Sequence, residues 1–219
     1  LATAPGAWLA WAVFAGTCGA TALGCFYAAL ATGTMGVVAP IAGLGAVVPV
    51  VLGVLGGETP SAFTWFGMLV ALIGTSLSGG PELRAGMPVR PIALAAVAAL
   101  GFGGVLYGLD RGAREALAPT IWAERVTVFL VLAAVVVLRR EAAAVGRHEL
   151  PLLAGIGLAD LAANALYAVA SSSGMVSVAS VLGSLYPVWT TGLAAVILHE
   201  RLRRIQVMGV ALTMVGVVA

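Results

Sequence analysis

The sequence predicts an all-α integral membrane protein, and three observations support this fold class. Hydrophobic residues make up 61% of the chain and charged residues 9%, whereas about a quarter of the residues in a soluble domain are charged. The hydrophobic residues form continuous runs close to the ~20 residues that a helix needs to cross a bilayer. Two parts of the chain also resemble each other, which indicates a duplicated helical unit.

About eight segments of this sequence are predicted to be transmembrane helices. The longest connections between them are GGPELRAGMPVR at 79–90 and RREAAAVGRHEL at 139–150. Neither is long enough to form a separate soluble domain. The predicted helices cover residues 7–31, 35–56, 61–79, 91–110, 118–138, 151–171, 175–198 and 203–219.

The first three and the last three of these helices are predicted to be copies of one unit. ETPSAFTWFGMLVALIGTSL at 58–77 aligns without a gap with ERLRRIQVMGVALTMVGVVA at 200–219, an offset of 142 residues. Just upstream, FYAALATGTMGVV at 26–38 resembles LYAVASSSGMVSV at 166–178, an offset of 140 residues. The alignments match Glu58 to Glu200, Gly67 to Gly209, Gly74 to Gly216 and Tyr27 to Tyr167.

Helices 91–110 and 118–138 have no counterpart ahead of residue 7, so each repeat is predicted to contain five helices. Residues 1–80 would then hold the last three helices of repeat one, residues 81–90 the inter-repeat loop, and residues 91–219 the whole of repeat two. The intact protein is predicted to have ten helices, with both natural chain ends outside this sequence. Because five is an odd number, the two repeats would insert with opposite orientation, as in many secondary transporters.

Polar residues are rare in these helices, and helix 151–171 holds the most informative set. Asp160, Asn164, Tyr167 and Ser171 are spaced so that all four lie on one helical face. Asp160 is predicted to lie about 14 Å deep by helical rise, where a charge costs about 3 kcal/mol. Its side chain is interpreted either as a ligand for a proton or a substrate amine, or as a structural hydrogen-bonding group for a neighbour such as Asn164.

Helix 175–198 is predicted to present a second polar face to the same cavity. The tight connection between the two helices would bring the faces together, and Ser184 is the candidate site residue among the serines, which are otherwise typical of helix packing. The corresponding positions of the first repeat are apolar or glycine, apart from Tyr27 and Pro49, so an asymmetric site is expected. The residues of this second face are Ser177, Ser180, Ser184, Pro187 and Thr191.

Three prolines, Pro40, Pro49 and Pro187, are predicted to lie inside helices, where each frees a carbonyl group. In a membrane such a break is tolerated where it is buried in protein or lines water. Pro187 lies close to Tyr186 and Trp189, so these residues are interpreted either as the wall of a solute pocket or as a packing kink.

Helix 118–138 carries an adjacent acid and base, Glu124 and Arg125. Neighbouring residues on a helix point about 100° apart, so the two are predicted not to form a good pair, and each needs another partner. Glu124 is the second candidate for a coupling residue. Glu58 and Glu200 are instead predicted to cap the helix that follows each of them. Gly104 and Gly108 indicate close helix packing.

The two copies also resemble a known family. ALYAVASSSGMVSVASVLGSLYPVWTTGLAAVILHERLRRIQVMGVALTMVGV at 165–217 and the weaker ALGCFYAALATGTMGVVAPIAGLGAVVPVVLGVLGGETPSAFTWFGMLVALIGTSL at 22–77 resemble the EamA-type family of the drug/metabolite transporter superfamily. The resemblance implies ten helices, alternating access and export of metabolites or amino acids, and it implies a structural or gating role for Arg125. The first copy departs from the pattern, because Thr59 and Pro60 replace the Arg and Leu that usually follow the glutamate.

The arginines give an orientation that conflicts with this resemblance. The positive-inside rule places the side with more arginines in the cytoplasm, whereas the family resemblance implies the reverse. The side with eight arginines contains Arg84, Arg90, Arg139, Arg140, Arg147, Arg201, Arg203 and Arg204, and the opposite side contains Arg111 and Arg114.

The predicted function is secondary active transport of a small organic solute, metabolite-like or amino-acid-like, by proton-coupled export. The alternative is a flippase for a lipid-linked substrate or a non-transporting subunit of a membrane complex. No enzymatic activity, cofactor or metal site is expected, because the sequence contains no catalytic or metal-binding motif. The net charge of +2 is spread over short loops, which excludes nucleic-acid binding. The Ala, Gly and Arg bias indicates a bacterial inner membrane, and a monomer is favoured.

Overall fold

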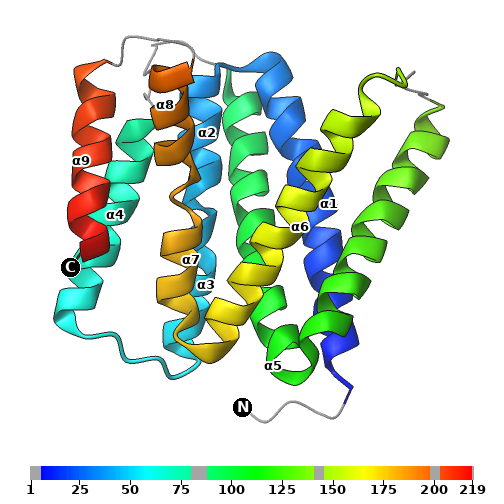
Figure 1. Cartoon of the computed structure of the whole chain (residues 1–219), viewed down its shortest axis with the longest axis horizontal. Coiled ribbons are helices and arrows are strands. Elements are labelled where there is room, and N and C mark those ends of the chain that lie inside the picture. Colours follow the sequence, from blue (N-terminus) through cyan, green and yellow to red (C-terminus); the bar gives the residue numbers. More distant parts are fainter. Residues whose placement is uncertain (1–5, 80–87, 141–145, 198–202, 219) are drawn as a thin grey trace.

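The computed structural model describes residues 6–79, 88–140, 146–197 and 203–218, and all regular structure over these residues is helical. The helices lie side by side in one bundle, with their connections at its two ends (Figure 1). Four helices are long and apolar enough to cross a membrane: Trp8–Thr32, Val37–Leu55, Val89–Arg139 and Leu150–Ser173. Shorter apolar helices cover Ala62–Ser78, Val176–Trp189 and Arg204–Val218. The chain is therefore a helical, multi-pass membrane protein.

Four helices match a predicted segment closely. α1 covers Trp8–Thr32, α4 covers Ala62–Ser78, α6 covers Leu150–Ser173 and α9 covers Arg204–Val218. α4 begins at Ser61, whose side-chain oxygen accepts a hydrogen bond from the backbone N–H of Thr64, as an N-terminal cap does.

α5 extends from Val89 to Arg139 and contains two of the predicted helices. Ala116 has a non-helical backbone, with φ −151° and ψ 91°, and divides α5 into a first arm of residues 89–115 and a second arm of residues 117–139. The arms run in opposite directions (Figure 1). Pro119 is the third residue of the second arm and costs no hydrogen bond, because the first helical turn has no intrahelical acceptor for its N–H groups.

Two predicted helices are each broken near mid-span. Segment 35–56 consists of α2, Met35–Gly43, the 3₁₀ turn Leu44–Ala46, and α3, Val47–Leu55. Segment 175–198 consists of α7, Val176–Gly183, and α8, Tyr186–Ile197. Each predicted segment is therefore a helical span whose geometry changes near its middle rather than a uniform helix, and the changes occur at equivalent places in the repeat alignment.

The prolines explain where the second halves start. Pro49 is the third residue of α3 and Pro187 is the second residue of α8. A proline in the first turn is compatible with a helix because its missing N–H has no intrahelical acceptor there. Of the three prolines predicted to lie inside helices, Pro40 lies inside α2, whereas Pro49 and Pro187 lie in the first turns of α3 and α8.

α1 lies between the two arms of α5 and contacts both through small residues. A Cβ atom on Gly104 of the first arm would lie 2.8 Å from Cys18 Sγ. A Cβ atom on Gly16 would lie 2.5 Å from Cβ of Thr127 in the second arm. These distances are too short for a side chain, so the glycines let the backbones approach closely, as predicted for Gly104.

α4 and α9 run antiparallel and meet through the glycines that the repeat alignment matched (Figure 1). A Cβ atom on Gly74 would lie 2.7 Å from the carbonyl oxygen of Gly209, and a Cβ atom on Gly216 would lie 2.6 Å from that of Gly67. The offset of 142 residues converts the first pair into the second. The five-helix inverted repeat stays a prediction, but reciprocal contacts of this kind are what it requires.

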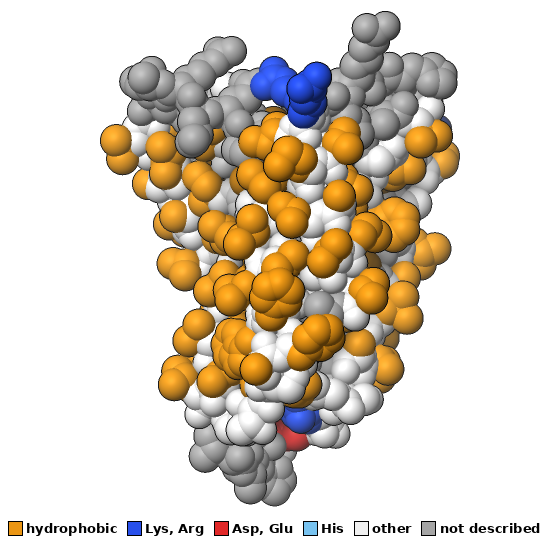
Figure 2. All heavy atoms as spheres, turned by 90° about the vertical axis from the view of Figure 1, so that its left-hand side faces the viewer, with side chains coloured by type: hydrophobic (Ala, Val, Ile, Leu, Met, Phe, Trp, Pro, Cys, Tyr) orange, Lys and Arg blue, Asp and Glu red, His pale blue; other side chains and the backbone are white. Residues whose placement is uncertain are grey.

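The outer face formed by α4 and α9 is suited to lipid. Figure 2 shows hydrophobic side chains over the middle of this face and charged side chains only at its two ends. Phe63 is 63% exposed and Ile73 is 56% exposed, both on α4, and Val215 of α9 is 57% exposed. Water would disfavour such a surface, whereas hydrocarbon does not.

The two ends of the bundle differ in their arginines. We call the end that contains Ala116, the α3–α4 connection and the α6–α7 connection the kink end (Figure 1). Two described arginines, Arg111 and Arg114, lie at or near it. The described arginines at the opposite end are Arg90, Arg139, Arg140, Arg147, Arg203 and Arg204.

Replacement of Gly209 by alanine is expected to separate α4 from α9. The new methyl group would meet backbone atoms of Leu77 and Ser78, and overpacking of this kind costs about 1–3 kcal/mol. Gly24→Ala is the matched control, because nothing lies within 4 Å of its Cβ position. Thermal unfolding of the detergent-solubilised variants should show a lower midpoint for Gly209→Ala only, and equal midpoints would contradict the proposed contact.

Candidate functional site

Three charged residues meet where α6 contacts the second arm of α5. Arg125 Nη1 donates a hydrogen bond to Asp160 Oδ2 at 2.6 Å. On its other side, Arg125 Nε lies 3.2 Å from Glu124 Oε2. The structure thus brings together three candidates that are up to 36 residues apart in the sequence. We call Glu124, Arg125 and Asp160 the charged triad.

Glu124 and Arg125 were predicted not to form a good pair with each other. Their charged groups lie within ion-pair distance, at 3.2 Å, but form no hydrogen bond with each other. Glu124 Oε2 and Arg125 Nε have no hydrogen-bond partner among the described residues. The 100° between neighbouring positions therefore prevents a well-aligned hydrogen bond but not close approach of the charges.

The two carboxylates of the triad have different surroundings. Glu124 is 3% exposed and Asp160 is 55% exposed, both as side chains. A Cβ atom on Gly19 would lie 3.9 Å from Glu124 Oε1, so Glu124 faces the small-residue side of α1. Only one of the two acids is therefore enclosed by the described part of the protein.

Asn164 belongs to the same group of residues. Its Nδ2 donates to the Asp160 carbonyl oxygen at 2.9 Å and to Asp160 Oδ1 at 3.3 Å. The hydrogen bond considered for these two residues is thus present. It orients the carboxylate of Asp160 and leaves the oxygen Oδ2 directed toward Arg125.

Tyr167 connects three helices. Its hydroxyl donates to the carbonyl oxygen of Leu106 at 3.1 Å in the first arm of α5, and it lies 2.8 Å from Ser180 Oγ in α7. The polar faces of α6 and α7 were predicted to line one cavity. In this structure they are packed together through Tyr167 and Ser180 instead.

The remaining candidates lie around the break between α7 and α8 or away from it. Ser184 Oγ donates to the carbonyl oxygen of Val181 at 2.7 Å, and its side chain is buried. The Tyr186 hydroxyl lies 3.7 Å from the Cβ position of Gly43, so the start of α8 faces the end of α2. Trp189 is 71% exposed and Tyr27 is 65% exposed, and neither contacts the charged triad.

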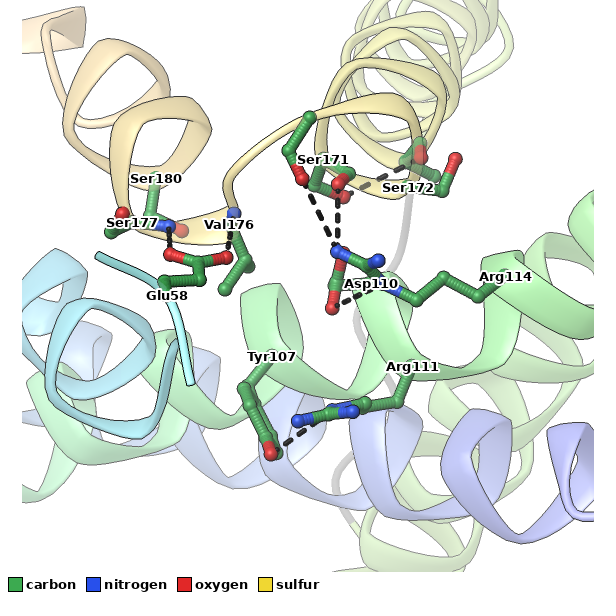
Figure 3. A network of polar contacts seen from close by, with 12 residues as sticks. Glu58, Tyr107, Asp110, Arg111, Arg114, Ser171, Ser172, Val176, Ser177 and Ser180 are labelled. Atoms are coloured by element: carbon green, nitrogen blue, oxygen red, sulfur yellow. Dashed lines mark hydrogen bonds and ion pairs between the residues drawn. The ribbon is translucent and has the colours of Figure 1, made fainter. Parts of the chain in front are cut away.

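Glu58 binds a helix that is distant in the sequence. Its Oε1 accepts a hydrogen bond from the N–H of Val176 at 2.6 Å, and its Oε2 accepts one from the N–H of Ser177 at 3.1 Å (Figure 3). The prediction that Glu58 caps the following helix is wrong, because Ser61 caps α4 and Glu58 caps α7. The matching residue Glu200 lies outside the described residues.

Arg114 binds the other side of the α6–α7 turn. Its Nη2 donates to the carbonyl oxygens of Ser171 at 3.1 Å and Gly174 at 3.3 Å. Asp110, which is 1% exposed, holds the guanidinium with oxygens 3.1 Å from Nε (Figure 3). A cation thus lies at the C-terminus of α6 and an anion at the N-terminus of α7, which is the favourable order for both helix dipoles.

These contacts form what we call the turn clamp: Glu58, Asp110 and Arg114 around the turn Ser171–Val176. The sequence reasoning missed it. The sequence feature that indicates the turn clamp is the charge-rich segment DRGARE at 110–115, which lies between two apolar helices. Two further residues of this segment also have partners: Arg111 Nε donates to the Tyr107 hydroxyl at 3.0 Å, and Glu115 Oε2 accepts from the N–H of Trp8 at 2.9 Å.

The hollows of the described chain include an open one of about 500 Å³ on the outer face of α4 and α9, which is lined by apolar residues such as Phe63 and Met214. A cavity of about 90 Å³ lies between α4, α7 and α9 and is lined mainly by apolar residues such as Met68, Val178 and Val181. Its volume is below the 300–1,000 Å³ usual for a small-molecule site. Among the described residues, no group of three or more His, Cys, Asp or Glu is placed to hold a metal ion.

Comparison with known proteins links this architecture to transport. Residues 89–219 match the model of the EamA-like transporter family. A solved structure titled "Crystal structure of protein" is similar in fold, with a TM-score of 0.72 and 20% sequence identity, over 99% of this chain and 88% of that chain. A search of curated proteins found no match.

Glu58→Ala is expected to loosen the start of α7. A hydrogen bond to a charged group contributes about 1.5–3 kcal/mol, so the amides of Val176 and Ser177 should exchange hydrogen roughly tenfold faster or more. Glu115→Ala is the matched control, because it should affect the start of α1 and leave α7 unchanged. Hydrogen exchange of the two variants, measured by mass spectrometry, would contradict the clamp if α7 responded equally to both.

Proposed function

Because the chain belongs to the EamA-like transporter family, we propose that it moves a small organic solute across a bacterial inner membrane by alternating access. The solute is metabolite-like or amino-acid-like, and its transport is coupled to protons in the direction of export. The following contacts support this proposal.

The observation that most strongly supports transport by alternating access is the pair of helical spans that are interrupted near their middle. α2 and α3 are separated by residues 44–46, and α7 and α8 by residues 184–185, which are equivalent positions of the two repeats. The hydroxyl of Tyr186 near Gly43 places the two breaks in the same part of the bundle. In secondary transporters, discontinuous helices at the interface of two repeats hold the solute near mid-membrane.

The reciprocal glycine contacts support an inverted repeat of five helices. α4 and α9 occupy equivalent positions in the alignment and run antiparallel (Figure 1). A two-fold axis in the membrane plane relates such a pair, and it exchanges the inward and outward sides of the two halves. Alternating access then consists of one half moving against the other.

The turn clamp is a suitable closure for one side of the pathway. Glu58 comes from the last part of repeat one, whereas the α6–α7 turn belongs to repeat two. Opening the kink end separates these parts and breaks the hydrogen bonds to Val176 and Ser177. The clamp would thus be formed in the conformation described here and broken in the alternative one.

The ion pair between Arg125 and Asp160 is the contact through which the solute acts. A solute amine can replace Arg125 at the Asp160 carboxylate. This exchange releases α6 from the second arm of α5. The role of Asp160 is therefore to connect occupancy of the site with movement of α6.

A test begins with the solute. The detergent-solubilised protein is heated with a panel of metabolites, since a ligand that binds only the folded state raises the unfolding midpoint. Solutes that stabilise it are then loaded into proteoliposomes, and their flux is measured as a function of pH. We expect pH-dependent flux in the wild type and pH-independent or absent flux in Asp160→Asn.

Glu149→Gln serves as the control for this experiment, because Glu149 is 51% exposed and its contacts among the described residues are with its near neighbours Gly146 and His148. Its flux should match that of the wild type. Normal flux of Asp160→Asn at every pH would remove Asp160 from the coupling mechanism, and flux of lipid-linked compounds alone would favour a flippase.

A further inference from the structure

The charged triad has an excess of one negative charge. With every group ionised, Glu124 and Asp160 contribute two negative charges and Arg125 contributes one positive charge. The closest charged atoms are 2.6 Å and 3.2 Å apart, so the three residues act as one electrostatic unit. An uncompensated charge inside a membrane-spanning bundle costs several kcal/mol. One bound proton makes the unit neutral.

The hydrogen bonds indicate which of the two acids holds this proton. Asp160 Oδ2 accepts the short hydrogen bond from Arg125 and Asp160 Oδ1 accepts one from Asn164. These donors stabilise the ionised form of Asp160. Glu124 Oε2 is buried and has no hydrogen-bond partner among the described residues. A buried carboxylate oxygen without a donor is costly when charged and much less costly when protonated.

The groups packed around Glu124 point to the same assignment. α1 presents Gly16 and Gly19 to this region, and the Cβ position of Gly16 lies 2.8 Å from the Glu124 carbonyl oxygen. The nearest titratable side chain of α1, Cys18, instead lies against Gly104 of the first arm. The charged groups that face Glu124 are therefore Arg125 on its own helix and Asp160 on α6.

We propose that Glu124 is the proton-binding residue of this protein and that Asp160 and Arg125 control when it is occupied. While Arg125 is bound to Asp160, Glu124 holds the proton. When Asp160 leaves with α6, Arg125 donates its hydrogen bonds to Glu124, whose O–H bond breaks and whose proton passes to water. The role of this proton in transport rests on the proposed function. The experiment below, which locates the proton, does not depend on transport.

The test measures the proton directly. Infrared spectroscopy of the purified protein in lipid nanodiscs at pH 7 detects the C=O stretch of a protonated carboxylic acid. The wild type should show this band, Glu124→Gln should lack its Glu124 component, and Glu149→Gln should retain it. In Asp160→Asn the component should also disappear, because Glu124 alone then neutralises Arg125.

Several results would overturn the proposal. These are a wild type without the band at pH 7, a band that persists unchanged in Glu124→Gln, and a band that persists in Asp160→Asn. Circular dichroism and gel filtration establish that each variant is folded. If Glu124→Gln does not fold, the loss of the band in Asp160→Asn tests the proposal instead. No solute is required, so a failure to find transport and a failure to find the proton are separate outcomes.

Discussion

Backbone groups that a helix leaves unpaired must find partners wherever lipid replaces water, and this requirement organises the kink end of the bundle. α7 begins with N–H groups that no residue of its own helix can accept, and Glu58 accepts two of them. α6 ends with carbonyl groups that Arg114 binds. α1 begins at a Trp8 N–H that Glu115 accepts. Glu58, Arg114 and Glu115 are thus used where helices begin and end.

Close approach of backbones is the second constraint, because apolar side chains gain no hydrophobic energy from leaving hydrocarbon. Glycine allows the helices to approach until backbone atoms are in contact, as at Gly74 and Gly209. The same residue type places α1 between the arms of α5. This packing fixes where Glu124 lies, since the glycine side of α1 leaves room for a carboxylate but offers it no hydrogen-bond donor.

The two halves of the bundle share their architecture but not their polarity. Both contain a helical span whose geometry changes near its middle. Polarity differs between the matched copies, however, because Ala20 and Gly24 occupy the positions that match Asp160 and Asn164. The acid and the amide of α6 thus occur in only one of the two matched copies.

The sequence by itself determined the helical class, the positions of most helices and the set of polar residues inside them, because these depend on local composition and on apolar run length. It also indicated Asp160, Asn164, Glu124 and Arg125 as candidates, since a charge within a membrane helix is costly wherever it lies. Only the tertiary structure decided their partners. Glu58 binds α7 rather than the nearby α4, and Arg125 forms its hydrogen bond with Asp160 rather than with the adjacent Glu124. These partners depend on distances between helices, which sequence spacing does not specify. The geometry of the two mid-span changes was left open for a related reason: Pro49 and Pro187 are equally compatible with a kink and with a new start, and packing against neighbouring helices selects between the two.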